Sequence, residues 1–457
     1  MKNKVELNID FQILGGGEEI GANSYLLRID NENILIDCGL HPRKKGMDIF
    51  PDYESIKNQT VQHLIISHAH NDHIGSLPYF LKLFPYGKVY TTKPTLAIAE
   101  VTLMNTSSII QKEFLDIWDN SALEYYTEET LNLIPMIIKQ QDYNTKIFLN
   151  DKVTFEFYDA GHILGSASVL INANGKRIFY TGDINMRDQA LIPSAELPKG
   201  KVDILILEST NGEEETLPAY RSEELRLANF INEITGDGGS VLIPVFALGK
   251  AQELLKRIDK LMETNKIPHM PVYFSPMAKL LNKVYDRYNY IIRRIEEGVK
   301  LSQIKVIELY RDYIEKGEFY KNPSIILATS GMMIEKTMSY HIAKKFLQRK
   351  NFGIAVCSYC DPDTPGYKIK YAKRYSRLYF NEFDNGTDVL CRIENFKFSS
   401  HTDRKGLLKI VDKLKPDKII LLHGSEEAIG EVGKEIVTKH KKIKVMVPQK
   451  GKTYDLT

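Results

Sequence analysis

Long hydrophobic runs and an excess of charge of one sign are both missing from this sequence of 457 residues. Without an apolar run of about 18 residues, no membrane-spanning helix is expected. The sequence has 61 Lys and Arg against 59 Asp and Glu, a net charge of +2, so overall charge indicates neither nucleic acid nor membrane as a partner. The first residues lack the apolar core of a signal peptide, and we expect no secretion by that route.

Cysteine is also scarce, with only four residues in the chain: Cys38, Cys357, Cys360 and Cys391. Four cysteines in a chain of this length do not make a disulfide framework. Cys357 and Cys360 form a single C-x-x-C pair inside an apolar run, and a second pair that would complete a zinc site is missing. We therefore expect ordinary buried thiols and a reducing, cytoplasmic location.

What is present is the composition of a globular α/β protein, 43% hydrophobic and 26% charged, long enough for two or three domains. Residues 1–208 are rich in short apolar strands, with a helical region predicted over 93–143. Residues 209–385 alternate continuous apolar strands with helices, which predicts a parallel sheet covered on both faces. Residues 386–457 read as strand, helix, strand and helix. Because no linker rich in Pro, Gly or Ser separates these parts, we expect an inserted domain rather than a linear array.

One short loop concentrates potential metal ligands. The segment SHAHNDH directly follows the apolar strand HLIIS and holds His68, His70, Asp72 and His73. The whole chain has 11 histidines, so three within six positions are improbable by chance. Imidazole nitrogens and carboxylate oxygens that converge on a turn suit zinc, and also manganese or iron. The loop therefore predicts a metal site.

Three more candidates stand at the ends of predicted strands. His162 follows FEFYDAG, Asp183 ends RIFYTGD, and His423 ends KIILLHG. Each alone is a weak signal, since a strand-end histidine is more often a structural residue. A two-metal site, however, requires about six or seven donors, and the loop already supplies four.

The order of these residues resembles a known superfamily. HAHNDH fits the HxHxDH signature of the metallo-β-lactamase fold, and Asp37 in LIDCG, His162 and Asp183 match its other motif positions. The resemblance implies an αββα sandwich, formed by residues 1–208 and 386–457, into which the domain of residues 209–385 is inserted.

The similarity is closer still to the β-CASP ribonucleases, which include the cleavage-and-polyadenylation endonuclease and ribonuclease J. Three further motif residues match that family: Glu208 in LILEST, His401 in FSSHTD and His423 in LLHG. The segments LGGGEEIGANSYLL, IPVFALGKAQELL and ATSGMM are similar to it as well. The resemblance therefore covers nearly the whole chain.

The resemblance implies two divalent cations, with Zn²⁺ favoured and Mn²⁺ as the alternative. His68, His70 and His162 are then the ligands of one ion, and Asp72, His73 and His423 those of the other. Asp183 bridges the two ions, which together hold a hydroxide that attacks the phosphodiester. Asp37 is expected to orient a ligand rather than to be one.

Catalytic roles follow from the same resemblance. Asp72 is expected to be essential for cleavage, His401 to protonate the leaving ribose oxygen, and Glu208 to orient His401. In-line attack leaves a 5′-phosphate and a 3′-hydroxyl. His423 favours RNA over DNA as the substrate, since the family's DNA-repair branch lacks this histidine. Single-stranded RNA is the expected form.

Candidate substrate contacts lie in the insert and after it. The Ser330–Gly331–Met332 loop, at the end of a predicted parallel strand, suits backbone N–H contacts to phosphate; the alternative is an ordinary turn. Ser399 and Ser400 are further candidates, unless they only shape the turn before a helix that Thr402 or Asp403 caps. The chain departs from the family pattern at Asn211, Glu335 and Lys336, which puts substrate preference rather than hydrolysis in question.

Several alternatives stay open. The chain stops soon after His423, which favours an endonuclease over the 5′-exonuclease action of ribonuclease J types. A DNA nuclease, a thioester or lactone hydrolase on the same scaffold, and a non-catalytic scaffold subunit are the others. Glu208 and His401 have no evident use in a small-ester hydrolase, and a scaffold subunit typically loses metal ligands that are all present here. A homodimer formed through the insert is a further expectation from the family.

Overall fold

The computed structural model describes residues 7–117, 125–381 and 384–457. The chain divides into two compact units. Unit 1 comprises Met1–Arg187, Ser194–Thr216 and His401–Thr457, and unit 2 comprises Asp188–Pro193 and Leu217–Ser400. These limits differ from the predicted boundaries at 208/209 and 385/386. Unit 2 extends beyond residue 385 because strand β19 (Arg392–Asn395) pairs with β16 (Gly353–Val356) of that unit.

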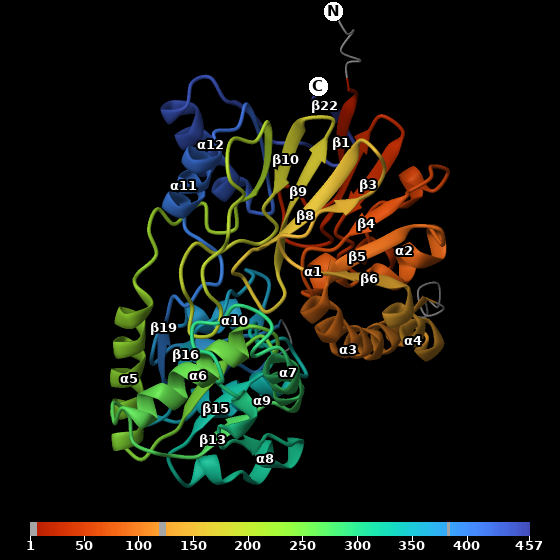
Figure 1. The fold of residues 1–457 in the computed structure, drawn as a ribbon. Helices are drawn as coiled ribbons and strands as arrows, with labels where there is room; N and C mark the ends of the chain where they lie inside the picture. The colour runs from red at the N-terminus through yellow and green to blue at the C-terminus, as the bar shows by residue number, and fades with distance from the viewer. Residues whose placement is uncertain (1–6, 118–124, 382–383) are drawn as a thin grey trace, which may run out of the picture. The chain divides into compact units, whose positions relative to one another are not determined.

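Unit 1 contains two mixed sheets, each of seven strands within the described residues (Figure 1). The strands of the first sheet, in spatial order, are β22 (Thr453–Asp455), β1 (Ile9–Gly15), β2 (Ser24–Ile29), β3 (Glu32–Ile36), β4 (His63–Ile65), β5 (Lys88–Thr92) and β6 (Ile138–Gln141). Those of the second are β21 (Lys444–Met446), β20 (Lys418–Leu422), β11 (Ile204–Glu208), β10 (Lys176–Tyr180), β9 (Ala167–Ala173), β8 (Val153–Asp159) and β7 (Ile147–Phe148).

The two sheets pack face to face through apolar side chains. Phe11 and Tyr25 of the first sheet share one buried cluster with Phe155, Ile178 and Ile206 of the second. On β8 the burial alternates residue by residue, as the two-residue period of a strand requires. Burial of these aromatic and branched side chains, worth about 1.5–3 kcal/mol each, is the main force that holds the sheets together.

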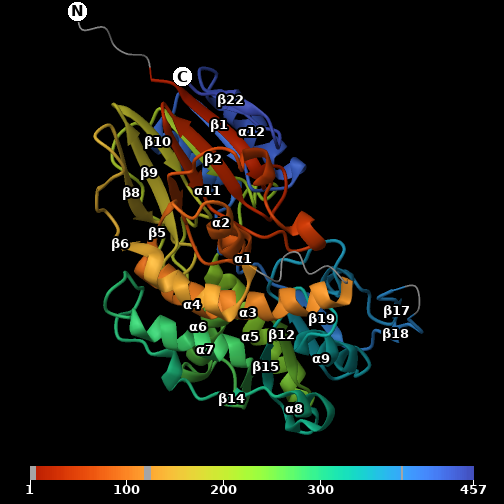
Figure 2. The same cartoon turned by 90° about the vertical axis from the view of Figure 1, so that its right-hand side faces the viewer.

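Helices cover the outer faces of both sheets, so unit 1 is the predicted αββα sandwich. The first sheet packs against α2 (Leu77–Leu83), α3 (Lys93–Ile117) and α4 (Glu128–Ile137). Figure 2 shows α3 and α4 below this sheet. The second sheet packs against α11 (Arg404–Leu414) and α12 (Glu426–Lys439). The short helix α1 (Asn71–Ile74) follows β4.

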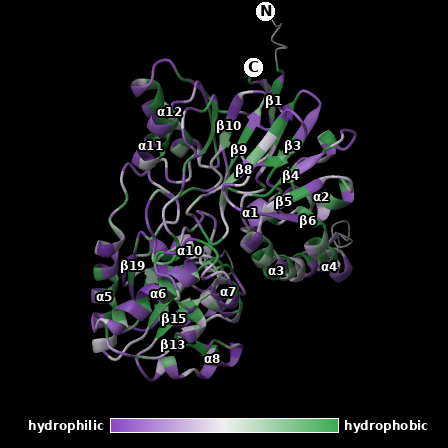
Figure 3. Ribbon diagram, viewed as in Figure 1, coloured by the Kyte–Doolittle hydropathy of each residue, from purple (hydrophilic) through white to green (hydrophobic). Residues whose placement is uncertain are grey.

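Unit 2 is built on the predicted parallel sheet. The strand pairs described in this sheet are all parallel, and their order is β14 (Ile307–Glu308), β13 (Val272–Phe274), β15 (Ile325–Ala328), β12 (Val241–Pro244), β16 and β19. One face carries α5 (Tyr220–Gly236), α6 (Lys250–Glu263) and α7 (Pro276–Arg287). The other carries α8 (Arg311–Lys316), α9 (Met338–Leu347) and α10 (Pro365–Lys370). Figure 3 shows α5 and α6 with hydrophilic and hydrophobic residues side by side, as helices with one buried face require.

The helical prediction for 93–143 is wrong at its C-terminal end. Helix α4 ends at Ile137, and the next four residues form β6, which pairs in parallel with β5. Pro135 lies inside α4 and does not end it; pairing with a neighbouring strand decides the conformation of the residues beyond Ile137. Residues 118–124 of that prediction lie outside the described residues. Among the described residues, no helix combines the length and the apolar character needed to cross a bilayer.

Candidate metal centre

The predicted ligands of unit 1 collect where its parallel strands end. β3 ends one residue before Asp37, and β4 leads into the loop of His68. In the second sheet, β10 leads to the turn of Asp183, β11 ends at Glu208, and β20 ends one residue before His423. Because the carboxyl ends of parallel strands meet at one edge, residues far apart in sequence become neighbours there.

Backbone hydrogen bonds fix the ligand loop against the first sheet. The carbonyl oxygens of Asp72 and His73 accept from the N–H groups of Asn23 and Cys38, at 2.9 and 2.8 Å. A Cβ atom at Gly39 would lie 1.7 Å from the carbonyl oxygen of Asp72, so this close approach requires glycine. These contacts hold the ligand loop against the first sheet.

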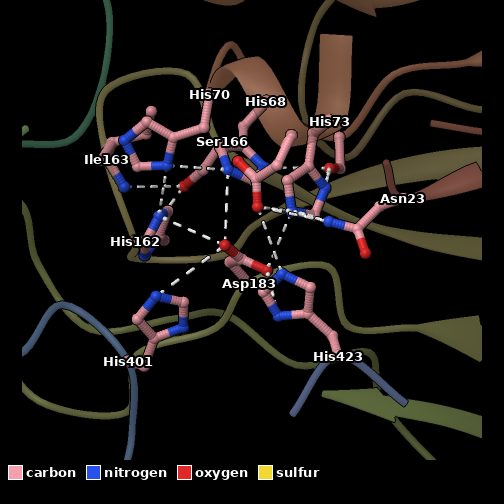
Figure 4. A network of polar contacts seen from close by, with 12 residues as sticks. Asn23, His68, His70, His73, His162, Ile163, Ser166, Asp183, His401 and His423 are labelled. Atoms are coloured by element: carbon pink, nitrogen blue, oxygen red, sulfur yellow. Dashed lines mark hydrogen bonds and ion pairs between the residues drawn. The ribbon is translucent and has the colours of Figure 1, made fainter. Parts of the chain in front are cut away.

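The first ligand group contains His68, His70, His162 and Asp183, whose donor atoms lie within 4.8 Å of one another (Figure 4). Nδ1 of His70 lies 3.1 Å from Nε2 of both His68 and His162. Oδ2 of Asp183 lies 3.5 Å from Nε2 of His68 and 3.6 Å from that of His162. Three imidazole nitrogens and one carboxylate oxygen thus face one small volume.

The second group contains Asp72, His73 and His423. Oδ2 of Asp72 lies 3.6 Å from Nε2 of His73 and 3.5 Å from Nε2 of His423. Asp183 joins this group through its other oxygen, since its Oδ1 lies 3.4 Å from Nε2 of His73 and 3.3 Å from Nδ1 of His423. Figure 4 shows Asp183 between the two sets of histidines, with one carboxylate oxygen toward each.

The residues fit divalent cations in both their chemistry and their charge. Oδ1 of Asp183 is buried and accepts no hydrogen bond from any described residue, an arrangement that is costly without a cation. Burial and the neighbouring His73 hold the pKa of His68 well below its ordinary value, so that ring is neutral and able to bind a metal. Burial raises the pKa of Asp183, but His423 and His73 outweigh it and hold that pKa well below its ordinary value. Neutral imidazoles and ionised carboxylates are the forms that divalent metals bind. Burial lowers the pKa of His73, but Asp183 and Asp72 outweigh it and raise that pKa well above its ordinary value, so this ring must lose a proton when a metal binds.

Asp37 lies behind this centre, against His73. Its Oδ2 is 2.8 Å from Nδ1 of His73 and also accepts from the hydroxyls of Ser67 and Tyr180, at 2.8 and 2.7 Å. Its Oδ1 accepts from the Ser67 N–H at 2.7 Å. Asp37 is fully buried, and both of its carboxylate oxygens make these contacts. Because Asp37 contacts Nδ1 of His73, Nε2 of that ring faces the centre.

His401 and Glu208 form a separate pair beside the first group. Nδ1 of His401 lies 3.0 and 3.1 Å from the two carboxylate oxygens of Glu208. Burial lowers the pKa of His401, but Glu208 and Asp183 outweigh it and raise that pKa to about 9. Nε2 of His401 lies 3.9 Å from Oδ2 of Asp183. The donor atoms of Asp183, Glu208 and His401 also lie within 4.8 Å of one another, so this trio is geometrically a third candidate for a metal.

The remaining predicted site residues belong to unit 2. Ser330, Gly331 and Met332 follow β15, and Oγ of Ser330 accepts from the Ile334 N–H at 3.1 Å. Among the described residues, the N–H groups of Gly331 and Met332 have no recorded protein acceptor. Ser399 and Ser400 lie at the end of unit 2, where the Ser399 carbonyl accepts from the Tyr220 hydroxyl at 2.5 Å. The five residues therefore lie outside the unit that carries the ligands.

Three family models match the chain, and together they cover most of it. The metallo-β-lactamase superfamily matches residues 17–200, and the β-CASP domain matches residues 251–369. The Zn-dependent metallo-hydrolase RNA specificity domain matches residues 386–448. The chain belongs to the metallo-β-lactamase superfamily, in its β-CASP branch. The resemblance seen in the sequence is confirmed.

Relatives of this β-CASP protein share 29% identity with it. An integrator complex subunit 11 homolog from Dictyostelium discoideum matches over 96% of this chain and 60% of its own length. The endoribonuclease YSH1 of Eremothecium gossypii matches over 94% of this chain and 57% of its own. The chain thus spans little more than half of these two relatives. An RNase J-like protein from Methanocaldococcus jannaschii matches over 96% of this chain and 97% of its own length.

A crystal structure supports the fold alone. A protein of unknown function from Enterococcus faecalis V583 aligns with a TM-score of 0.59 and 14% identity. The alignment covers 98% of this β-CASP protein and all of the other chain.

Several residues at the centre were not predicted. Asn23 places Nδ2 3.0 Å from Nε2 of His73 and 3.3 Å from Oδ2 of Asp72. Thr210 places its hydroxyl 3.0 Å from Nδ1 of His423. Asn211, noted only as a departure from the family pattern, donates to the carbonyl oxygen of His401 at 3.1 Å. A clue in the sequence was the position of both Thr210 and Asn211 within three residues of Glu208.

Proposed function

We propose that this chain is a metal-dependent endoribonuclease that cleaves single-stranded RNA and leaves 5′-phosphate and 3′-hydroxyl ends. One observation carries the proposal. In unit 1, two ligand groups share Asp183, and the His401–Glu208 pair lies beside them. The names of the endoribonuclease and RNase J-like relatives, and the match to an RNA specificity domain, support RNA as the substrate.

In this proposal two cations occupy the two ligand groups. One cation would be held by His68, His70 and His162. The other would be held by Asp72, His73 and His423, and Asp183 would serve both groups. Zn²⁺ is favoured because the donor set is rich in imidazole, and Mn²⁺ is the alternative. When bound, such ions supply hydroxide at neutral pH and offset negative charge on the phosphate.

The protein's own groups have distinct proposed tasks. Asp37 accepts a hydrogen bond from the Nδ1–H of His73 and so keeps Nε2 of that ring available as a ligand. His401, with its pKa raised to about 9, is protonated at neutral pH and donates that proton to the leaving ribose oxygen. Glu208 accepts a hydrogen bond from the Nδ1–H of His401, which leaves Nε2–H as the acidic position.

Substrate contacts are proposed for residues of unit 2. The N–H groups of Gly331 and Met332, with the Ser330 hydroxyl, suit the oxygens of a phosphate. Ser399 and Ser400 adjoin His401 in sequence and are proposed to contact the RNA backbone close to the scissile bond. A 5′-exonuclease is the second candidate, favoured by similarity to the RNase J-like protein over nearly the full length of both chains.

Cleavage of long single-stranded RNA labelled at either end tests the proposal. Metal-loaded protein is compared with Asp72→Asn, and DNA of matched sequence serves as a control. Internal fragments that only the unmodified protein makes support an endoribonuclease, and 5′ mononucleotides support the exonuclease. Metal-loaded protein that leaves RNA intact overturns the proposal.

We also propose an oligomeric state and a cellular location for the chain. A homodimer is proposed from the family, and light scattering on the eluate of a sizing column measures it. A reducing, cytoplasmic location is proposed because the four cysteines are buried free thiols.

A further inference from the structure

A basic and aromatic segment of unit 2 takes no part in the proposed catalysis. Residues 367–379, YKIKYAKRYSRLY, contain a tyrosine at every fourth position, five basic residues and no acidic residue. The segment runs from α10 through a turn into β17 (Arg377–Leu378), which pairs with β18 (Thr387–Asp388). Figure 2 shows this hairpin at the periphery of its unit. We call residues 367–379 the tyrosine strip.

Three rings of the strip face solvent. Tyr371, Tyr375 and Tyr379 are 59%, 70% and 54% exposed, whereas tyrosine usually buries most of its ring. Tyr375 has a φ of +68°, a conformation rarely adopted by a bulky residue. Lys370 lies 5.4 Å from the ring centre of Tyr371, and Arg374 lies 5.1 Å from that of Tyr375. Tyr371 and Tyr375 thus each carry a cation over one ring face, and Tyr371 also lies 4.6 Å from Tyr367, centre to centre, so the exposed part of each ring is what remains for a ligand.

Most of its positive charge is not neutralised by neighbours. Lys368 and Arg374 donate to backbone carbonyl oxygens, which position the side chains and leave their charge in place. Arg377 lies 3.5 Å from Asp388, in the one ion pair recorded for the strip among the described residues. Within that part of the chain, no acidic partner is recorded within 4 Å of Lys370 or Lys373. A polyanion with flat bases would meet complementary charge and stacking surfaces here.

We propose that the tyrosine strip is an accessory binding site for single-stranded RNA. Unpaired bases stack on Tyr371, Tyr375 and Tyr379, while the backbone phosphates lie near Lys370 and Lys373. Single strands fit better than duplexes because a duplex keeps its bases stacked inside. The site extends the proposed function, on which it rests, by adding affinity for RNA beyond the bond that is cleaved.

Fluorescence anisotropy of the full chain tests the strip, with Asp72→Asn present throughout to prevent cleavage. The probe is a labelled oligouridylate of about 20 nucleotides, longer than one small domain usually binds. The stacking variant combines Tyr371→Ser, Tyr375→Asn and Tyr379→Ser, since Asn tolerates the backbone conformation at position 375. We expect it to raise Kd at least about tenfold, because each stacked base contributes substantially.

The charge variant combines Lys370→Gln and Lys373→Gln. We expect the slope of log K against log salt to fall by about 1.4, since each phosphate that a lysine neutralises on a single strand adds about 0.7 to that slope. A matched control removes two exposed tyrosines elsewhere in unit 2, Tyr290→Ser and Tyr310→Ser, which are 74% and 54% exposed. Its Kd is expected to stay within about twofold of the parent.

Two further readouts separate the strip from the catalytic proposal. In chains that keep Asp72, hydrolysis of bis(p-nitrophenyl) phosphate should be equal with and without the strip changes. If the stacking and charge variants bind RNA as tightly as the unmodified strip does, and RNA cleavage is normal, the strip proposal alone is overturned. A parent chain that neither binds nor cleaves RNA overturns both proposals. If the stacking variant does not fold, photocrosslinking of 4-thiouridine RNA to the chain with an unchanged strip tests the proposal instead. The proposal predicts adducts within residues 367–379, and adducts found only elsewhere refute it.

Discussion

At the scale of single residues, a few charged contacts decide what each side chain of the centre can do. His68 and His401 are both buried histidines close to Asp183. Burial and His73 depress the pKa of His68, whereas Glu208 raises that of His401 despite its burial. One ring is therefore suited to bind a cation and the other to deliver a proton.

His401→Ala should keep its metal but lose most of its turnover. The change removes the proposed acid and none of the seven proposed ligands, and a general acid contributes about 10²–10⁴-fold to a rate. Metal content by plasma mass spectrometry and RNA cleavage are measured on the same preparation. A loss of bound metal along with activity would show that His401 is a ligand, as its proximity to Asp183 and Glu208 permits.

The cysteines should be unreactive in the folded chain. Burial raises the pKa of Cys357 and Cys391 to about 12 and that of Cys360 to about 11, and it raises that of Cys38 well above its ordinary value. All four thiols are then protonated at pH 8, and only the thiolate is the nucleophile. Ellman's reagent should titrate none of them rapidly before denaturation and all four afterwards; rapid labelling of the native chain contradicts the burial described.

The sequence predicted which residues come together at the centre better than it predicted the side chains that support them. The proposed ligands carry recognisable spacing or strand-end positions. Asn23 and Tyr180, by contrast, are ordinary residues in or beside strands, whose side chains meet His73 and Asp37 only because the sheets pack together. A contact between separate strands leaves no local pattern in the sequence.

At the scale of elements, the ends of strands and helices position the chemistry. Helix α11 begins directly after Asp403, two residues beyond His401, and the structure resolves which residue caps it. The Asp403 carboxylate accepts from the Gly406 N–H at 2.9 Å. The neighbouring Thr402 has a buried hydroxyl that forms no hydrogen bond with any described residue. The start of this helix thus anchors the segment that presents His401.

Asp403→Ala should lower the free energy of unfolding by about 1–2 kcal/mol, the usual cost of removing an N-cap. Lys409→Ala, at an exposed position in the same helix, is the control and should change it by less than about 0.5 kcal/mol. Urea denaturation followed by circular dichroism measures both variants. Equal stability of the two would mean that the cap contributes nothing.

Elements were predictable where a continuous apolar run dominates. Four such runs in the insert became neighbouring parallel strands, β12, β13, β15 and β16. The stretch Ile138–Gln141 falls within the predicted helix because its residues, IKQQ, do not favour a strand, and pairing with β5 overrides that preference. Local propensity cannot report a partner that lies more than 40 residues earlier in the chain.

At the scale of the whole molecule, the chain leaves unit 1 and returns to it more than once. The short segment Asp188–Pro193 belongs to unit 2, where the Glu253 carboxylate accepts from the N–H groups of Ala190 and Leu191. An insertion was predictable from the change in strand pattern, but this excursion of six residues was not, since no composition shift marks it. Ligands on both sides of the insert, from His68 to His423, still meet in one unit.

Metal should therefore stabilise the fold as well as support catalysis. A ligand at about 100 times its Kd adds about 2.7 kcal/mol to the stability of a chain that binds it only when folded. Chelator-treated protein should melt at a lower temperature than protein reloaded with Zn²⁺, as followed by scanning fluorimetry. Asp183→Asn should lose most of this difference in melting temperature, whereas the control Lys409→Ala should keep it. An unmodified chain whose melting temperature does not change with Zn²⁺ contradicts the assignment of the metal ligands.

The most direct test of the two-cation centre is anomalous diffraction at the zinc edge from crystals of the Zn²⁺-loaded chain. The account predicts two peaks, one among His68, His70 and His162 and one among Asp72, His73 and His423, both beside Asp183. A single peak, or a peak between Glu208 and His401, would contradict it.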